Sequence, residues 1–433
     1  VGSGALDANT TAQHNVAVGK GALTTVTTGG FNTAIGGDAL AVNTTAAGST
    51  AVGFGALDAN TTADFSTAVG YNALSGNTTG AQNTAVGAYA AEAATTANNI
   101  TAVGYHAGND LTTGSENTLI GRDAGSALTS GANNTYIGHR AGDANTTSSN
   151  NVGVGFHCLG SNTTGNGNTA VGYYSLLNST TATGNTALGF EALKASTTGY
   201  GNVAMGLNAG HQTTTGHLNT LIGGSYSTYV GGAITTASQN VVLGVDGGAA
   251  LTTGVGHVFI GSFAGRNTTS SAYNICLGYG GSCSNATTNH EILIGSYNNT
   301  GKGSNTAFIN ANGGAVYAGN NSSSFATTSD RRIKKNIVDN NVGLDAINKV
   351  QVRNFEYRTA DEIDELPTHS AIDRQGVQLG VIAQEIKEVL PDMVKTEETG
   401  CMSVNPENMT WHLVNAVKEL SAKVAELEAR LGD

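Results

Sequence analysis

The sequence has 433 residues with 61 glycines, a net charge of −12, 12% charged residues and 6% aromatic residues. Such a composition differs from that of an average globular protein and indicates a repetitive fold. Clustered Lys and Arg, which binding to a nucleic-acid backbone requires, are missing from the long first part, and no apolar run is long enough to span a membrane. Because Val1 begins without the charged and apolar regions of a signal peptide, we expect the chain to continue a longer protein.

A glycine preceded by an apolar residue recurs every seventeen residues from Gly2 to Gly223, and again from Gly244 to Gly295 after a four-residue insertion in the segment 225–240. Three residues before these glycines stands a β-branched residue, which favours a strand. The residue between is mostly Ala, as in NTAVG at 83–87, so both faces of the strand are apolar. We expect one face to fill its own coil and the small Ala face to be covered by another copy of the chain.

Each repeat continues with a second short apolar piece, such as YNAL at 71–74, and a polar turn, such as NTTG at 77–80. The repeat therefore predicts two short strands and two corners, which are stable only when stacked. Seventeen steps of about 4.8 Å predict a mainly β fold, a β-solenoid rod of roughly 80 Å. Asn four residues before the glycine, as at Asn83 and Asn168, predicts a ladder of side-chain amides that bond coil to coil.

Other interpretations of the rod are weaker. The Thr-Thr pairs place their hydroxyls on opposite faces, whereas an ice-binding surface needs them on one face. The Asn-Thr-Thr triplets match the glycosylation pattern only as a by-product of turn composition. The turns carry no regular carboxylate for calcium, and we expect His106, His139 and His157 to be solvated or packed, so no metal or cofactor is predicted.

The four cysteines do not make a disulfide framework. Cys276 and Cys283 are close enough in sequence to pair, whereas Cys158 and Cys401 have no evident partner, and the simpler interpretation is that all four are small buried side chains.

The NTAVGY repeats, which cover roughly residues 1–300, resemble those in the long fibres of bacteriophages and, more distantly, the β-roll heads of trimeric bacterial adhesins. This resemblance implies a virion fibre or a surface filament made of several chains.

The composition changes at Ser329: residues 1–328 carry 6 Lys/Arg and 12 Asp/Glu, and the remaining residues carry 13 and 19. We therefore divide the chain into a rod at 1–295, a Gly/Asn/Ser-rich neck at 296–328 and an α+β domain at 329–433. In that domain, 352–358 alternates like a strand, and 377–394 predicts a strand followed by a short helix.

The C-terminal helix carries a heptad pattern that predicts a coiled coil over about 411–431. We define the helix seam as its six apolar residues Leu413, Val417, Leu420, Val424, Leu427 and Leu431. The alternative is an amphipathic helix packed on its own domain. Self-association agrees better with the uncovered face of the rod, and we expect three chains, although mixed Leu and Val do not fix the number.

The stretch TTSDRRIKKNI at 327–337 gathers four cations beside a Ser-Asp pair. A serine needs a neighbouring base to act as a nucleophile, and a lysine serves when burial and nearby cations lower its pKa. The alternative is a helix that begins at Ser329, with the serine as N-cap and a solvated basic face.

SDRRIKKNI, then LGVIAQEIKEVLPDMV at 379–394, then the heptads resemble the self-cleaving intramolecular chaperone of endosialidases and phage tail fibres, a serine peptidase family. The resemblance implies that this domain forms a homotrimer, aligns the three chains and is then cut off between Thr328 and Ser329. Ser329 would be the nucleophile and Lys334 the base. Asp330 and Gln384 are candidates for support and for stabilising the oxyanion. No external substrate is expected.

Together these observations predict a homotrimeric tail fibre of a virion, whose partners are a host-surface glycan or protein and other tail components. The alternative is a bacterial adhesin or extracellular filament built from the same repeats. An enzyme that acts on glycans is the third hypothesis, but no pair of carboxylates stands out in the rod.

Overall fold

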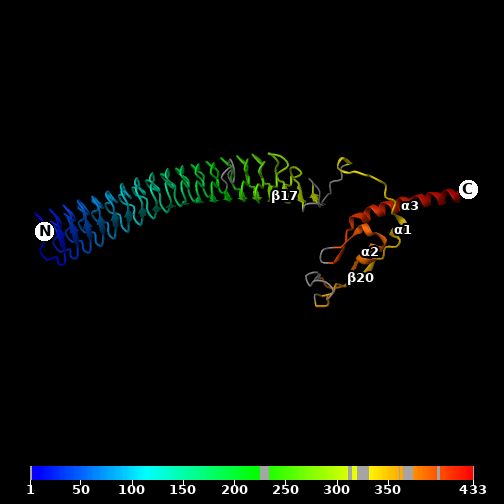
Figure 1. Cartoon of the computed structure of the whole chain (residues 1–433), viewed down its shortest axis with the longest axis horizontal. Helices are drawn as coiled ribbons and strands as arrows, with labels where there is room; N and C mark the ends of the chain where they lie inside the picture. Colours follow the sequence, from blue (N-terminus) through cyan, green and yellow to red (C-terminus); the bar gives the residue numbers. More distant parts are fainter. Residues whose placement is uncertain are drawn as a thin grey trace. The chain divides into compact units, whose positions relative to one another are not determined.

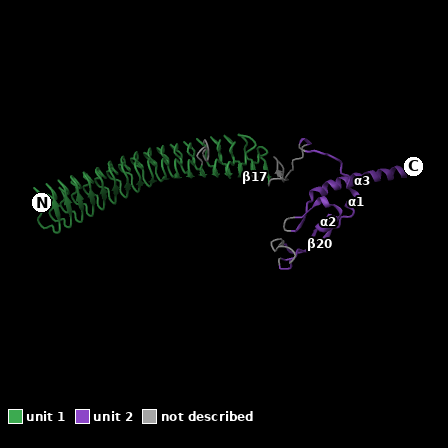
Figure 2. Cartoon of the chain, viewed as in Figure 1, with its two compact units in different colours: residues 1–328 green, residues 329–433 purple. Residues whose placement is uncertain are grey.

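The computed structural model describes residues 2–224, 234–310, 315–318, 331–359, 361–363, 374–396 and 400–432. The chain divides into two compact units, residues 1–328 and residues 329–433, which Figure 2 shows in different colours. Each unit has a hydrophobic core of its own.

Unit 1 is a parallel β-solenoid of about seventeen turns (Figure 1). Each turn contributes one short strand, which pairs in parallel with the strand of the next turn, as Thr169 does with Thr186. At the insertion the pairing skips four more residues, from Thr220 to Val241, and then resumes. The strands are β1 (Val16–Val18), β2 (Thr33–Ile35), β3 (Thr50–Val52), β4 (Thr67–Val69), β5 (Thr84–Val86), β6 (Thr101–Val103), β7 (Thr118–Ile120), β8 (Thr135–Ile137), β9 (Val152–Val154), β10 (Thr169–Val171), β11 (Thr186–Leu188), β12 (Val203–Met205), β13 (Thr220–Ile222), β14 (Val241–Leu243), β15 (Val258–Ile260), β16 (Ile275–Tyr279) and β17 (Ile292–Tyr297).

The residue at the middle of each three-residue strand, which is Ala in most coils, points into its own coil. In β5, Ala85 is fully buried, while the flanking Thr84 and Val86 point outward and Val86 is 38% exposed. The expectation that Ala faces a neighbouring chain was therefore wrong. The strand is only three residues long and apolar on both faces, so its sequence lacks the alternation that would identify the inner face.

The second apolar piece of the repeat is not a strand, contrary to the prediction. In YNAL, Asn72 and Leu74 have φ of 51° and 52°, in the left-handed region, so the backbone is not extended. The amide of Leu74 still donates to the carbonyl of Ala90 in the next coil, at 3.0 Å. Each coil therefore has one pleated strand and, opposite it, a non-extended segment in which left-handed residues alternate with others. Both segments are hydrogen-bonded to the next coil.

The repeated glycine is required by the close approach of successive coils. At Gly172 φ is +134°, and a Cβ there would lie 2.4 Å from the carbonyl oxygen of Gly189 in the next coil. Any side chain would clash with backbone at this corner, in a conformation that is almost confined to glycine. The period of the glycines is therefore the length of one coil.

The predicted ladder of side-chain amides is confirmed. Asn185 is fully buried, its Oδ1 accepts from the backbone amide of Asn202 at 2.9 Å, and its Nδ2 donates to the carbonyl of Gly199 at 2.8 Å. His257 occupies one place in this ladder and makes equivalent bonds. Its Nε2 donates to the Ser271 carbonyl at 3.0 Å, and its Nδ1 accepts from the Asn274 amide at 3.1 Å.

Strand pairing continues beyond Gly295. The strand β18 (Ala307–Asn310) pairs in parallel with β17, and β19 (Ala315–Ala318) pairs with β18 in the antiparallel direction. The segment that the sequence assigned to a neck, 296–328, therefore begins as part of the sheet.

Unit 2 is a small α+β domain with two separate two-stranded antiparallel sheets, β20–β21 and β22–β23. Ile386, Leu390 and Met393 form the centre of its core. The strand at 352–358 and the strand and helix at 377–394 are found where they were predicted. The elements are η1 (Arg331–Ile333), α1 (Leu344–Ile347), β20 (Arg353–Phe355), β21 (Gln378–Gly380), α2 (Ala383–Val389), η3 (Pro391–Met393), β22 (Val394–Thr396), β23 (Met402–Val404) and α3 (Glu407–Leu431).

Candidate functional site

Of the predicted cleavage site, Thr328, Ser329 and Asp330 lie outside the described residues. The cations that follow are described: Arg331 and Arg332 belong to the short helix η1, and the Lys334 amide donates to the Arg331 carbonyl at 3.2 Å. Lys334 is exposed, so a single chain does not provide the burial that a lysine base requires.

Gln384, the candidate oxyanion donor, lies in the first turn of α2, a helix that buries Ile386 against the domain core. Its side chain is exposed. In a single chain, Gln384 and Lys334 are thus both exposed, and no described contact brings their side chains together.

The helix α3 presents two different faces. The helix seam, Leu413, Val417, Leu420, Val424, Leu427 and Leu431, is open, and each of its side chains is between 45% and 86% exposed. His412 and Ala416, on another face of the same helix, are buried against unit 2. The alternative in which the seam packs on its own domain is therefore not what the structure shows. The domain holds α3 by a different face and leaves the seam exposed.

The buried face of α3 fixes the chain segment 340–344 through side chains. His412 Nδ1 lies 3.1 Å from the Val342 carbonyl oxygen, and Asn415 Nδ2 donates to the Asn340 carbonyl at 2.7 Å. Glu419 Oε2 accepts from the Leu344 amide at 3.0 Å. This clamp of His412, Asn415 and Glu419 therefore fixes to α3 the chain that leads out of the cationic motif.

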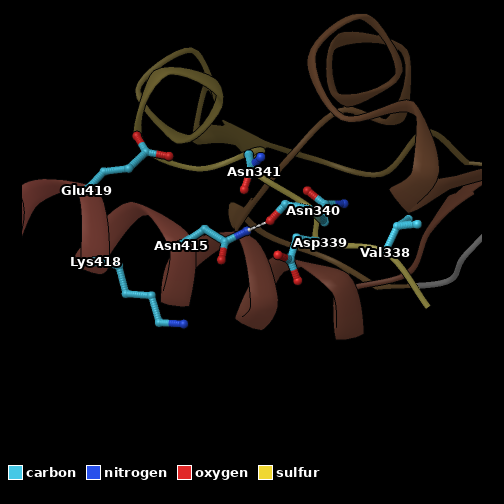
Figure 3. Close-up of a pocket in the computed structure, with 7 residues that line it drawn as sticks. All are labelled: Val338, Asp339, Asn340, Asn341, Asn415, Lys418 and Glu419. Carbon is cyan, nitrogen blue, oxygen red and sulfur yellow. Dashed lines mark hydrogen bonds between the residues drawn. The ribbon is translucent and has the colours of Figure 1, made fainter.

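The clamp borders an open polar hollow of about 680 Å³ (Figure 3). Val338, Asp339, Asn340 and Asn341 line it on one side, and Asn415, Lys418 and Glu419 of α3 line it on the other. Figure 3 shows Asn415 pointing toward Asn340 across this hollow. Among the residues that the structure describes, no group of three His, Cys, Asp or Glu is arranged to hold a metal ion.

A second open apolar surface runs along the rod. We define the rod stripe as the residues directly before the repeated glycines, such as Val86, Leu188 and Ile260, which are 38%, 43% and 41% exposed. Because they stand at the same place in strands paired in register, they form a continuous column on the outer face of the sheet.

No described helix is long and apolar enough to cross a membrane.

Aromatic rings flank the rod stripe, and the sequence analysis missed them. Phe156, Tyr173 and Phe190 stack on one another with ring centroids 5.0 and 5.2 Å apart, and Phe54 stacks on Tyr71 at 5.6 Å. Each of them directly follows a repeated glycine, and this common position was the available signal. Because the rings stack face to face along the rod, mainly their edges remain exposed.

Two histidines at the corners lie close to carboxylates of the preceding coil. His157 Nε2 lies 3.3 Å from Asp143, and His211 Nε2 lies 3.0 Å from Glu191. Burial lowers the pKa of His157 and of His211 from its ordinary value, although the carboxylates act in the opposite direction.

The chain is thus a parallel β-solenoid rod followed by a small α+β domain whose long helix exposes an apolar seam. Residues 329–395 match the model of the peptidase S74 family, the chaperone of endosialidase. This match lies within unit 2 and supports a chaperone domain of the endosialidase type there, whereas the rod lies outside it. No solved structure was found to match the chain.

Proposed function

We propose that the chain is one of three in a fibre, in which unit 1 is the shaft and unit 2 is a chaperone that aligns the chains. The observation that carries this proposal is that the match to the chaperone family and the second compact unit both begin at Ser329. A domain that is discarded after use has to fold separately from the part that remains, and the cut has to fall between them.

Two open apolar surfaces support the association of several chains, and the number three comes from the resemblance to the trimeric chaperones. The helix seam follows a heptad repeat, and such helices bury their a and d residues against each other. The rod stripe needs a cover over its whole length, and a copy of the same rod has an equally long apolar column. Apolar surface of this extent on a soluble protein marks an interaction site.

Register is the physical reason for a chaperone. Because all coils present nearly the same stripe, two rods can pair after a slip of one whole repeat with little loss of contact. The helix seam is short and lies at one end of the chain. Its pairing therefore fixes the register of the chains before their rods associate. Once unit 2 is removed, the fibre is held by slow unfolding.

The proposed cleavage follows from the residues at the boundary. Ser329 Oγ attacks the carbonyl carbon of Thr328 while Lys334 takes the hydroxyl proton, and the peptide bond becomes an ester with a free Ser329 amine. Water then hydrolyses the ester, which leaves the Thr328 carboxylate and restores the Ser329 hydroxyl. Backbone amides or Gln384 stabilise the oxyanion, and Asp330 supports the site. Lys334 is exposed in one chain. We therefore propose that it becomes buried only in the trimer, and that cleavage occurs there.

The resemblance of the repeats to phage fibres supports the proposal of a virion tail fibre, with other tail components and a glycan or protein of the host surface as its partners. The same rod and chaperone also suit an extracellular filament of a bacterium, which is the alternative location.

Mass measurement under denaturing conditions tests the cleavage. We expect wild-type protein to yield a fragment that begins at Ser329, and Ser329→Ala and Lys334→Ala to remain full length. Lys349→Ala, which removes an exposed lysine paired with Asp345, is the matched control and should be cut normally. A full-length mass for the wild type, or cleavage of the serine variant, contradicts the peptidase proposal.

Sedimentation tests the assembly. The uncut Ser329→Ala protein should sediment as a trimer. Adding Val417→Asp in the helix seam should give single chains, whereas Ala422→Asp, on the outer face of α3, should not. A Ser329→Ala protein that remains a single ordered chain would refute the fibre proposal. In a background with Ser329 intact, Val417→Asp should also prevent cleavage.

A further inference from the structure

Two cysteines lie in contact inside the last part of the rod. Cys276 is the inward-facing residue of β16, between Phe259 of the preceding strand and Leu293 of the next, a place that Ala holds in most coils. Cys283 comes from the opposite wall of the same coil. Both are fully buried, and their Sγ atoms are 3.6 Å apart.

The backbone between them is built to adjust. Three of the six intervening residues are glycines, and Gly278 and Gly280 have φ of 118° and 64°. The pairing of β16 with β17 also shifts its register between Leu277 and Tyr279, so the sheet is irregular at this place. A disulfide needs the sulfurs to come about 1.5 Å closer. Glycines and a register shift allow a small backbone movement of this size at low cost.

The surroundings of the two sulfurs favour a reaction between them. Thr268 Oγ1 donates to Cys283 Sγ at 3.3 Å, which stabilises a thiolate on Cys283. The hydrogen bond with Cys283, together with burial, raises the pKa of the Cys276 thiol, so Cys283 is the one to ionise first. By contrast, Cys158 is buried elsewhere in the rod and directs its thiol to the Gly155 carbonyl.

We propose that Cys276 and Cys283 are a redox pair that forms a disulfide across the interior of the coil and fastens the C-terminal end of the rod. A metal site would need further ligands, and the described residues contain no group of three His, Cys, Asp or Glu arranged to hold a metal ion. This inference does not depend on the chaperone or on cleavage.

The oxidant is a small disulfide such as glutathione disulfide. The Cys283 thiolate attacks one sulfur of glutathione disulfide, forms a mixed disulfide and releases one glutathione thiolate. The Cys276 thiolate then attacks the Cys283 sulfur and releases the second. Two protein thiols thus lose two electrons and two protons, and one glutathione disulfide becomes two glutathione molecules. Because both sulfurs are buried, the exchange takes place when this end of the rod opens locally.

Thiol counting on the full chain tests the pair. A Cys158→Ser, Cys401→Ser protein, in which only the pair remains, is reduced, incubated with glutathione disulfide at rising temperature, unfolded in acid and alkylated. We expect both thiols to be protected without a glutathione adduct and the mass to fall by two hydrogen atoms. Chymotryptic cleavage after Tyr279 should then give two peptides joined by the bond. In the same background, Cys283→Ser should leave Cys276 free to alkylate or carrying glutathione.

Two outcomes of the thiol count would overturn the proposal. One is that both thiols remain alkylatable after incubation at every temperature up to the unfolding transition, and the other is that each cysteine carries its own glutathione. Hydrogen exchange gives a second measure on folded protein. The amides of β16, β17 and β18 should exchange at least about tenfold more slowly after oxidation, and equal exchange would show that the bond does not fasten the rod end.

Discussion

Replacing His257 by Asn should reduce the acid sensitivity of the rod. The imidazole takes the place of an Asn in the ladder, between Asn240 and Asn274, and it accepts and donates the same kinds of bond as its neighbours. An Asn at this position can keep all three bonds, but it cannot take up a proton. The substitution therefore changes the titration while it preserves the hydrogen bonds.

The magnitude follows from the pKa of His257, which burial lowers from 6.5 to about 4. Between these values the unfolded chain binds a proton and the folded chain does not, so stability is complete above pH 6.5 and falls as the pH drops to about 4. The gap, at about 1.4 kcal/mol per pH unit, amounts to about 3 kcal/mol per chain. Protonation would also place a hydrogen on Nδ1, which now accepts from the Asn274 amide.

Denaturant unfolding of the wild type and of His257→Asn at pH 7.0 and at about pH 4, followed by circular dichroism, measures this difference. The variant loses the stacking of the ring on Phe259, at 4.9 Å, so its stability at pH 7 alone is not informative. The quantity to compare is the loss of unfolding free energy between the two pH values, which should be smaller in the variant by about 3 kcal/mol. Equal losses in both proteins would refute the argument.

Three further predictions concern packing. Gly172→Ala should lower the free energy of unfolding by at least about 3 kcal/mol because its Cβ meets the next coil, whereas Gly184→Ala, at φ +64° with open space around it, should cost about 1 kcal/mol; thermal unfolding of both variants checks this, and equal effects would contradict it. Asn185→Leu should lower the free energy of unfolding by about 3 kcal/mol in the same measurement, since it leaves the Asn202 amide and the Gly199 carbonyl without these partners. An unchanged free energy would show that the ladder does not stabilise the rod. Gly343→Ala should loosen the segment 340–344, because its Cβ would lie 2.3 Å from Glu419 Oε1; faster hydrogen exchange at Leu344 is the expected result, and unchanged exchange would show that the clamp tolerates the methyl group.

The sequence contained the period of the rod but not the orientation of its strands. Hydrogen bonds between coils join equivalent positions, so the glycine at each corner and the Asn of each ladder recur in the sequence at the length of one coil. The inner face depends on where the chain turns, and the turns use left-handed residues as different as Asn72, Leu74 and Tyr89. Such backbone conformations leave no common residue type by which to find them.

The candidate site was predictable only where it is local. The helix seam follows from residues three and four apart on one helix, and the structure leaves it open as expected. The clamp escaped prediction because Asn415 and Glu419 bind backbone groups that lie 75 residues earlier in the chain, and backbone groups carry no residue identity. Ser329 and Lys334 were predicted from a resemblance; Ser329 lies outside the described residues, and Lys334 is exposed.

The close match between one coil and the next has a consequence for how such genes change. A gain or loss of a whole seventeen-residue unit leaves the remaining glycines at their corners and gives each surviving hydrogen bond an equivalent partner. Unequal recombination between repeats can therefore lengthen or shorten the shaft and keep every coil complete, whereas a change by a few residues shifts all later glycines out of the period, as the four-residue insertion in the segment 225–240 does in the sequence. The length of the rod can therefore change by whole coils from one gene to its descendants.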